Sequence, residues 1–234
     1  MIILYHPRST KPRSRRFPLA VLSLAAVLEG REEYTIVDGN VDADPLHTIE
    51  ELIARHQVEL LAVSVMPGPQ MVAAMHTCRE IRSHYPRLPI VWGGYFPSIY
   101  TDATLHANYV DFAVRGQGED TFLELIEGLR GKRALTEIRG LSFRDARGRS
   151  VHNPERPMKS PDDFPWYPYH RIRAEDYVLP TFLGRRTAVH QASVGCPFRC
   201  NFCGVTTAFG SREKMESPAR TEAILKHLAV TYGV

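Results

Sequence analysis

The sequence has 234 residues, of which 44% are hydrophobic and 24% are charged, and its formal net charge is only +3. These values are typical of an ordinary globular chain of one or two domains with enough apolar residues for a sizeable core. The longest uncharged apolar stretch near the start, residues 17–28, is too short to span a membrane. The first five residues lack the basic head and long apolar body of a signal peptide. We therefore expect a cytoplasmic protein with no membrane partner.

From residue 1 to about residue 130, short β-rich apolar runs alternate with helical patterns. Such alternation favours right-handed strand–helix–strand units and an α/β fold with a doubly wound parallel sheet. Five strands predict a flavodoxin-like order in a domain spanning residues 1–135. The expected strands are residues 2–5, 34–37, 60–65, 90–92 and 110–114, and the expected helices are residues 17–29, 46–56, 70–84, 98–107 and 119–129.

The loops that leave these strands are the candidate binding loops, because ligands of open α/β sheets collect at the carboxyl ends of the strands. Three of the loops contain glycines, at Gly68, at Gly93 and Gly94, and at Gly116 and Gly118. Glycine lets a backbone approach a ligand closely, although ordinary turns use glycine too. The first loop, residues 6–16, is long and basic. It is either a solvated run of charge or a contact for a phosphate of a cofactor or substrate.

Residues 136–185 are predicted to form a proline-rich connector. Six of the 17 prolines fall between Pro154 and Pro180. Residues 141–143 and 149–151 form a hairpin pattern within this region. The aromatic run at residues 165–169 is expected to pack its rings on a neighbouring domain rather than to cover substrate.

Three of the four cysteines, Cys196, Cys200 and Cys203, lie within eight residues at CxxxCxxC spacing, after an expected strand at residues 187–194. Closely spaced thiolates hold iron–sulfur clusters, and three thiolates leave one iron open to a substrate or co-substrate. Zinc would require a second pair of ligands, which the sequence does not supply. A disulfide is disfavoured in a cytosolic protein. The fourth cysteine, Cys78, is interpreted as a small buried apolar residue.

The CxxxCxxC motif, with Phe202 just before the last cysteine, resembles the signature of the radical S-adenosylmethionine (SAM) enzymes. The resemblance implies that Cys196, Cys200 and Cys203 hold a [4Fe-4S] cluster. It also implies that SAM binds the fourth iron and that Phe202 lies near the adenine.

A five-stranded α/β domain that ends in residues 114–125, ahead of this motif, resembles the cobalamin-binding class of radical SAM proteins. The likeness covers essentially the whole chain and includes residues 37–40 and 92–94. It implies a Rossmann-like cobalamin-binding fold whose strand-end loops receive the corrin. The implied site residues are Ser64, Met66, Gly68, Gly93, Gly94, Tyr95, Gly116, Gly118 and Glu119.

The sequence departs from one pattern of cobalamin-binding domains, the motif that supplies a histidine ligand to cobalt. Cobalamin domains that ligate cobalt through histidine carry DxHxxG after the first strand, and here His6 stands without that motif. Related radical SAM proteins share the absence, so the resemblance implies a cobalt without imidazole from this motif. It also leaves open a degenerate domain that binds no cobalamin.

The chemistry implied by the resemblance is reductive cleavage of SAM to a 5′-deoxyadenosyl radical, followed by cobalamin-dependent methyl transfer to an unactivated carbon of a small-molecule substrate. Oxidative cyclisation or rearrangement without methyl transfer is the alternative. The expected electron donor is a reductant such as flavodoxin or ferredoxin. Two other classes stay open. One is a non-enzymatic corrinoid-binding module, and the other is a nucleic-acid-modifying enzyme, for which basic residues 11–16 are the only indication.

Residues 186–234 are predicted to begin a radical SAM (β/α) barrel and contain one expected strand and one expected helix. Ser217 and Pro218 have the character of a helix cap and a first-turn proline, and Gly233 is expected to end that helix. We expect the sequence to be the amino-terminal part of a longer enzyme, inactive alone and with an exposed apolar edge.

Overall fold

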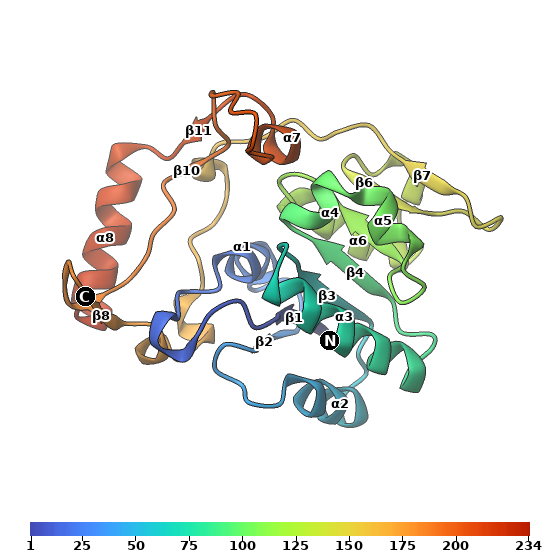
Figure 1. The fold of residues 1–234 in the computed structure, drawn as a ribbon, viewed down its shortest axis with the longest axis horizontal. Helices are drawn as coiled ribbons and strands as arrows, with labels where there is room; N and C mark the ends of the chain where they lie inside the picture. The colour runs from blue at the N-terminus through green and yellow to red at the C-terminus, as the bar shows by residue number, and fades with distance from the viewer.

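The apolar runs near the amino terminus pair with one another to form the centre of a sheet. The structure, a computed structural model, describes residues 1–234. Its main sheet has seven strands in the order β2-β1-β3-β4-β5-β6-β7 (Figure 1). The first five strands run parallel, and they are β1 (Ile2–His6), β2 (Tyr34–Asp38), β3 (Leu60–Ser64), β4 (Ile90–Gly93) and β5 (Phe112–Val114). This doubly wound arrangement confirms the α/β fold class predicted from the sequence.

Helices cover both faces of the sheet, which explains why the central strands are apolar on both sides. Successive residues of a strand point to opposite faces. Leu4 therefore joins a buried cluster with residues of α1 (Leu19–Leu28) and α6 (Glu119–Leu129). Ile3 joins a second cluster with residues of α2 (Pro45–Arg55) and α3 (Pro69–His84). The helices of this region are α1 (Leu19–Leu28), α2 (Pro45–Arg55), α3 (Pro69–His84), α4 (Tyr95–Ile99), α5 (Thr101–His106) and α6 (Glu119–Leu129).

The helix expected at residues 98–107 is instead the two short helices α4 and α5. The first begins earlier than predicted, because Gly94 has a φ of 95° and turns the chain sharply out of β4. Tyr100 then separates the two helices with a ψ of 53°, outside the helical range. Both changes are backbone conformations that the apolar pattern does not encode.

The hairpin pattern in the connector is part of the main sheet. Strand β6 (Leu141–Arg144) pairs antiparallel with β5, and β7 (Ser150–His152) pairs antiparallel with β6. Leu141 and Phe143 are buried in the same cluster as the residues of α6. The sheet is therefore larger than the five strands predicted, because the free edge of β5 accepts the hairpin. The division into domains at residues 1–135, 136–185 and 186–234 stays a prediction.

An irregular segment and a carboxyl-terminal arm follow the sheet. The arm lies along one side of the sheet domain in Figure 1, with α8 far from the strands and α7 close to their ends. Its regular elements are β8 (Leu179–Thr181), β9 (Gly184–Thr187), β10 (Ser193–Val194), α7 (Val205–Phe209), β11 (Lys214–Met215) and α8 (Pro218–Tyr232). Short 3₁₀ turns occur at Pro12–Ser14, Leu135–Glu137, Pro161–Asp163, Tyr169–Arg171 and Ala174–Asp176.

An aromatic cluster attaches the arm to the sheet domain. The ring centroid of Tyr169 lies 5.1 Å from that of Phe17, which precedes α1. Ile224 and Leu228 of α8 are buried in the same cluster. Tyr169 therefore packs as predicted for the aromatic run at residues 165–169, whereas Tyr167 of the same run also lines the cavity described below.

The prediction of a strand at residues 187–194 is wrong for most of these residues. Strand β9 ends at Thr187, and only Ser193 and Val194 form a strand, which pairs antiparallel with β11. A strand needs a neighbour for its backbone N–H and C=O groups, and β11 supplies one over two residues only.

Helix α8 agrees with its predicted signals. The Ser217 side chain accepts a hydrogen bond from the backbone N–H of Arg220 at 3.3 Å, and Gly233 ends the helix with a φ of 63°. Exposed apolar side chains occur in the arm, among them Phe182, which is 97% exposed. None of the helices combines the length and apolar content needed to cross a membrane.

Candidate functional site

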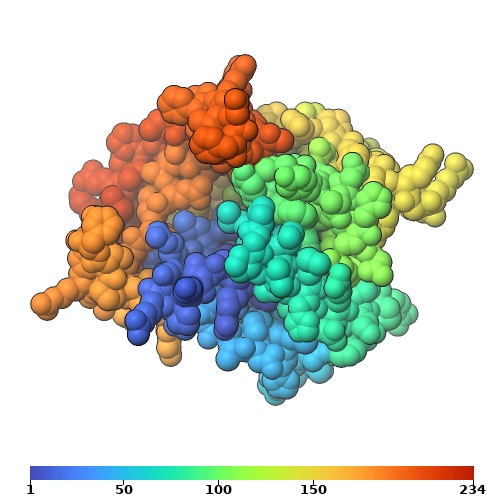
Figure 2. All heavy atoms as spheres, viewed as in Figure 1, coloured from blue at the N-terminus to red at the C-terminus, as the bar shows by residue number.

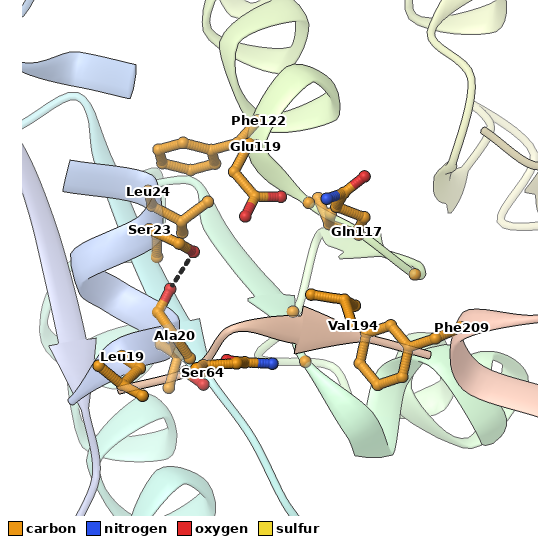
Figure 3. A pocket seen from close by; sticks show the side chains of 18 of the residues that line it. Leu19, Ala20, Ser23, Leu24, Ser64, Gln117, Glu119, Phe122, Val194 and Phe209 are labelled. Carbon is orange, nitrogen blue, oxygen red and sulfur yellow. Dashed lines mark hydrogen bonds between the residues drawn. The ribbon is translucent and has the colours of Figure 1, made fainter. Parts of the chain in front are cut away.

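A cavity of about 350 Å³ lies at the carboxyl ends of β3, β4 and β5. Helix α1 and the start of α6 form its walls, and the segment that precedes the cysteine motif closes it, together with α7 (Figure 3). It therefore lies where parallel strand ends meet, the usual ligand position in open α/β sheets. Its lining includes Leu19, Ala20, Ser23, Leu24, Ser64, Gly93, Gly94, Gly116, Gln117, Gly118, Glu119, Phe122, Tyr167, Gln191, Ser193, Val194, Gly195, Val205 and Phe209.

Most of the strand-end residues singled out in the sequence line this cavity together, and four predicted cofactor contacts do not. The six that line it are Ser64, Gly93, Gly94, Gly116, Gly118 and Glu119. Met66 and Gly68 follow β3 outside the cavity, and Met66 is 53% exposed. Tyr95 opens α4 and faces Gly204 beyond the cysteines. Phe202 is 93% exposed.

The glycines that line the cavity are required for different structural reasons. Gly94 has a φ of 95°, and a Cβ there would lie 3.2 Å from the carbonyl oxygen of Val65. Gly94 is thus required by the backbone turn itself. Gly118 has an ordinary φ of −93°, and its Cβ would approach Val114 Cγ1 at 3.2 Å. At Gly118, therefore, a side chain is limited by the packing of the cavity wall and not by backbone strain.

Glu119 places a carboxyl group in this mostly apolar cavity, facing α1 near Ser23 and Leu24 (Figure 3). Its Oε2 atom is buried and has no hydrogen-bond partner. Burial raises the pKa of Glu119, and the backbone N–H of Glu119 and the nearby Ser23 hydroxyl, which itself donates to the Ala20 carbonyl at 3.0 Å, act in the opposite direction. In its protonated form this carboxyl group can donate a hydrogen bond to an acceptor in the cavity, whereas the ionised form can only accept.

His6 ends β1 but does not line the cavity. Its ring lies 3.4 Å from Gln70 Nε2 and 3.4 Å from Ser9 Oγ. Burial lowers the pKa of His6, with the Asp38 charge opposing the shift. Gln70 also accepts a hydrogen bond from the backbone N–H of Met66 at 2.8 Å. The histidine therefore belongs to a network that joins the first loop to the loop after β3.

The basic loop at residues 6–16 folds back onto the β2–α2 connection. Asn40 Oδ1 accepts hydrogen bonds from the backbone N–H groups of Ser9 and Thr10, both at 3.0 Å. Arg15 Nε donates to the Asn40 carbonyl at 2.8 Å. The neighbouring Asp38 accepts from the hydroxyl of Tyr177 at 2.7 Å. Residues 37–40 thus anchor both the basic loop and the connector, and the basic loop lies outside the cavity.

The cysteine motif occupies the exposed loop between β10 and α7. Cys196 is half-buried, and Cys200 and Cys203 are exposed free thiols. No three Cys, His, Asp or Glu side chains of the structure are gathered as a metal site, so the loop is not preassembled around a metal. The donor set nevertheless fits a cluster held by three thiolates, since all three thiols are free and share one loop.

Cys78 has a different environment from the three motif cysteines. It is fully buried in α3 and accepts a hydrogen bond from the indole N–H of Trp92 at 3.3 Å. Burial raises the pKa of the Cys78 thiol to about 12. The prediction that Cys78 is a small buried core residue is confirmed.

The cavity and the cysteine loop adjoin. Ser193, Val194 and Gly195 close the cavity, and Cys196 is the next residue. Gly195 holds this segment close to the chain after α7, because a Cβ there would lie 2.3 Å from the Arg212 carbonyl oxygen. In the space-filling view, the orange and red residues lie directly against the blue and green ones (Figure 2).

Sequence reasoning missed the residues that reach the cavity from outside the strand ends. They include Ser23, Tyr167, Val194 and Phe209. Gln117, which also lines the cavity, lies within the predicted strand-end loop at residues 116–119. Nothing in the local sequence connects Ser23, in an apolar helix, with Phe209.

Comparisons with known proteins point to one family. The family described as "B12 binding domain" matches residues 8–126. An uncharacterized methyltransferase of Pyrococcus horikoshii is 27% identical over 219 residues, covering 93% of this chain and 47% of that protein. The anaerobic magnesium-protoporphyrin IX monomethyl ester cyclase of Synechocystis is 28% identical over 238 residues, covering 98% of this chain and 46% of that protein.

Among solved structures, the fold is similar to that of the radical SAM methyltransferase TsrM from Kitasatospora setae, with cobalamin and a [4Fe-4S] cluster bound. The TM-score is 0.71 at 21% sequence identity, and the match covers 98% of this chain and 46% of that one. The chain therefore spans about half the length of the curated relatives it matches.

Proposed function

The chain belongs to the B12 binding domain family, which matches just over half of its residues, and on this premise we propose that it serves a cobalamin-dependent radical SAM enzyme. The resemblance to cobalamin-binding radical SAM proteins stated from the sequence is confirmed at the level of family and fold. The reaction is proposed for a protein of the relatives' full length, because this chain spans about half of it.

The single observation that carries the proposal is the continuity between the cavity and the cysteine loop. One extended segment closes the cavity with Ser193, Val194 and Gly195 and continues directly into Cys196. A cofactor over the strand ends and a cluster on the cysteine loop would therefore face a common space. A substrate that loses a hydrogen atom at one cofactor and receives a methyl group from the other must lie within reach of both, which requires this kind of proximity.

For cobalamin, the cavity can receive only a part of the molecule. Its volume of about 350 Å³ is far below that of a complete corrin with its side chains. The apolar walls and the carboxyl of Glu119 suit a flat apolar group that carries a hydrogen-bond acceptor. The macrocycle would then lie outside, over the loops that contain Met66, Gly68 and Tyr95.

For the cluster, we propose Cys196, Cys200 and Cys203 as ligands, with SAM at the open iron. With the cluster and SAM held by these residues, the pair would supply the chemistry for hydrogen-atom abstraction from an unactivated carbon. The residues of this chain bind and orient the two cofactors. Phe202 is exposed beside the last cysteine and is available to stack on the adenine.

Methyl transfer to a small-molecule substrate is the favoured outcome, because a curated relative and the similar structure are both named methyltransferases. Oxidative cyclisation is the second candidate, since another relative is named a cyclase. Both require an external electron donor such as flavodoxin or ferredoxin. Reduced thiols are needed to assemble the cluster, and we therefore place the protein in the cytoplasm.

Anaerobic reconstitution with iron and sulfide, combined with a hydroxocobalamin titration, tests the proposal. We expect about four irons and four sulfides per chain and saturable cobalamin binding. Cys196→Ala, Cys200→Ala or Cys203→Ala should abolish the cluster, and the matched Cys78→Ala should retain it. Stoichiometric zinc without iron would refute the cluster. Cobalamin binding without iron would favour a non-enzymatic corrinoid module, and iron without cobalamin would favour a degenerate first domain.

A further inference from the structure

A second and larger cavity, of about 690 Å³, lies on the other side of α7 from the first. Its wall is formed by the loop after β5, the start of the connector, and α7 with the loop that follows it. The two cavities share Gly116, Gln117 and Phe209 in their walls. Unlike the first cavity, this one is lined mostly by polar and charged residues.

Positive charge dominates the wall of this cavity. It contains Arg115, Arg156, Arg212 and Lys214 but one carboxylate, Glu155. Arg156 is already neutralised, because it pairs with Glu124 and lies 4.0 Å from Asp120. The side chains of Arg212 and Lys214 form no ion pair and no hydrogen bond within the protein. With Arg156 left out, the wall contains three positively charged side chains and one carboxylate.

Arg115 lines this cavity, and not all of its N–H donors have a hydrogen-bond acceptor. One of its terminal nitrogens donates to the Asn153 carbonyl, and its Nε is buried without any acceptor. Burial lowers the pKa of Arg115, with the charge of Glu155 opposing the shift. Unsatisfied buried donors are uncommon in folded proteins and call for a partner. An anion in the cavity would offset the cost of burying this guanidinium.

Free hydroxyl groups complete the set of donors. Thr206 and Thr207 of α7, and Ser211 in the loop after it, line the cavity, and their hydroxyls have no partner in the protein. Guanidinium, ammonium and hydroxyl donors around one space are the groups that recognise phosphate oxygens. A divalent cation would be repelled here, and an apolar ligand would leave the donors without partners.

We propose that this second cavity binds a phosphate-class oxyanion, a phosphate or phosphonate group, between Arg212, Lys214 and Arg115. This inference rests on the proposed function only where it identifies the molecule that carries the phosphate-class group. Because the cavities share a wall, the group belongs either to the substrate presented to the cobalamin face or to the phosphate of the cobalamin nucleotide. The chemistry required of the site is the same in both cases.

Calorimetric titration of the whole chain with sodium pyrophosphate, against sodium chloride at equal ionic strength, tests the site. We expect one saturable site per chain. Arg212→Gln with Lys214→Gln should weaken binding by about tenfold or more, the loss expected for charge-assisted hydrogen bonds. The matched control is Arg87→Gln with Arg185→Gln, which removes the same charge from exposed residues outside both cavities and should change binding less than about twofold.

Absence of saturable binding, or equal weakening in the control pair, would overturn the proposal. Thermal unfolding of both double variants shows whether they remain folded. The melting temperature of each should change little, because the replaced side chains form no ion pair or hydrogen bond within the protein. A second titration with hydroxocobalamin-saturated chain identifies the source. Unchanged pyrophosphate binding assigns the group to the substrate, and competition assigns it to the cofactor; either result supports the site. Failure of hydroxocobalamin itself to bind would refute the proposed function while leaving the pyrophosphate result intact.

Discussion

His190 Nε2 lies 2.7 Å from a carboxylate oxygen of Glu216, which joins the segment before β10 to the start of helix α8 within the carboxyl-terminal arm. Glu216 also accepts hydrogen bonds from Thr221 Oγ1 at 2.7 Å and from Arg220 Nε at 3.0 Å. Only 2% of the Glu216 side chain and 9% of the His190 side chain are exposed. Although burial acts to raise the pKa of Glu216, the hydrogen bonds from His190, Thr221 and Arg220 hold it below its ordinary value.

This pair predicts that the packing of segments within the carboxyl-terminal arm is sensitive to acid. Glu216→Ala should lower the free energy of unfolding at pH 7 by about 3 kcal/mol, because it leaves the Arg220 guanidinium and the buried His190 ring without their hydrogen-bond partner. The pKa is lower in the folded state, so the contribution is complete above the unfolded-state value near 4.5. It is lost as the pH falls from there through the folded-state value.

Urea unfolding at pH 7 and at pH 4 checks this prediction. The difference between the native chain and Glu216→Ala should shrink at the lower pH. Glu222→Gln is the control, since Glu222 makes an exposed i,i+4 pair with Lys226, and its effect should stay below about 0.5 kcal/mol. An equal effect of both substitutions, or a pH-independent effect of the first, would contradict the role assigned to Glu216.

The carboxyl of Glu119 should respond to pH in the opposite sense. Its pKa is raised in the folded state, so burying the ionised form opposes folding at pH values above the ordinary range of a glutamate. Glu119→Gln should therefore increase the free energy of unfolding at pH 8 by about 1 kcal/mol, the size typical of single substitutions, and change it little at pH 4. Urea unfolding at the two pH values measures this effect.

The neighbouring residue supplies the control for Glu119. Asp120 pairs with Lys159 at 2.6 Å and does not line the cavity, so Asp120→Asn should destabilise slightly instead. A loss of stability in Glu119→Gln at pH 8 would mean that the carboxylate, rather than the neutral acid, is the form that the cavity favours.

Gly118 and Gly94 should differ when replaced by alanine. Gly118→Ala fits the backbone but places a methyl group against Val114 in the cavity wall. It should weaken hydroxocobalamin binding by about tenfold while lowering stability by about 1 kcal/mol, the low end of the cost of overpacking. Gly94→Ala should destabilise the fold by about 1–3 kcal/mol, because its φ of 95° is unfavourable for any side chain.

Spectrophotometric titration and thermal unfolding separate these two effects. Gly184→Ala is a neutral control, since its Cβ would meet only Thr187 Cγ2 at 3.8 Å, far from the cavity. Native-like cobalamin affinity in Gly118→Ala would place the cofactor somewhere other than this cavity.

His6 should be structural rather than a cobalt ligand. Its ring is bound within the protein by Gln70 and Ser9 and lies outside the cavity. His6→Ala should lower stability by about 1–3 kcal/mol and leave hydroxocobalamin affinity within about twofold. The electron paramagnetic resonance spectrum of the reduced cobalt(II) state should show no axial protein nitrogen. A nitrogen coupling that disappears in His6→Ala would identify His6 as a ligand after all.

The amino-acid sequence by itself determined the parallel core of the sheet and part of the candidate site. Alternating strand and helix patterns specify β1 to β5, because right-handed crossovers leave few ways to order such units. All their carboxyl ends then meet at one edge, so Ser64, Gly94 and Glu119 were placed together correctly. The cysteine motif was visible because its spacing lies within a single loop.

Only the tertiary structure decided which distant segments meet. The hairpin of β6 and β7 was recognised, but its pairing with β5 depends on a free strand edge that no local pattern reveals. Tyr167 and Phe209 reach the first cavity, and Arg212 joins Arg115 in the second, through chain folding over many residues. Local patterns encode the conformation of a segment and the face it buries, whereas its neighbours are chosen by the packing of the whole chain.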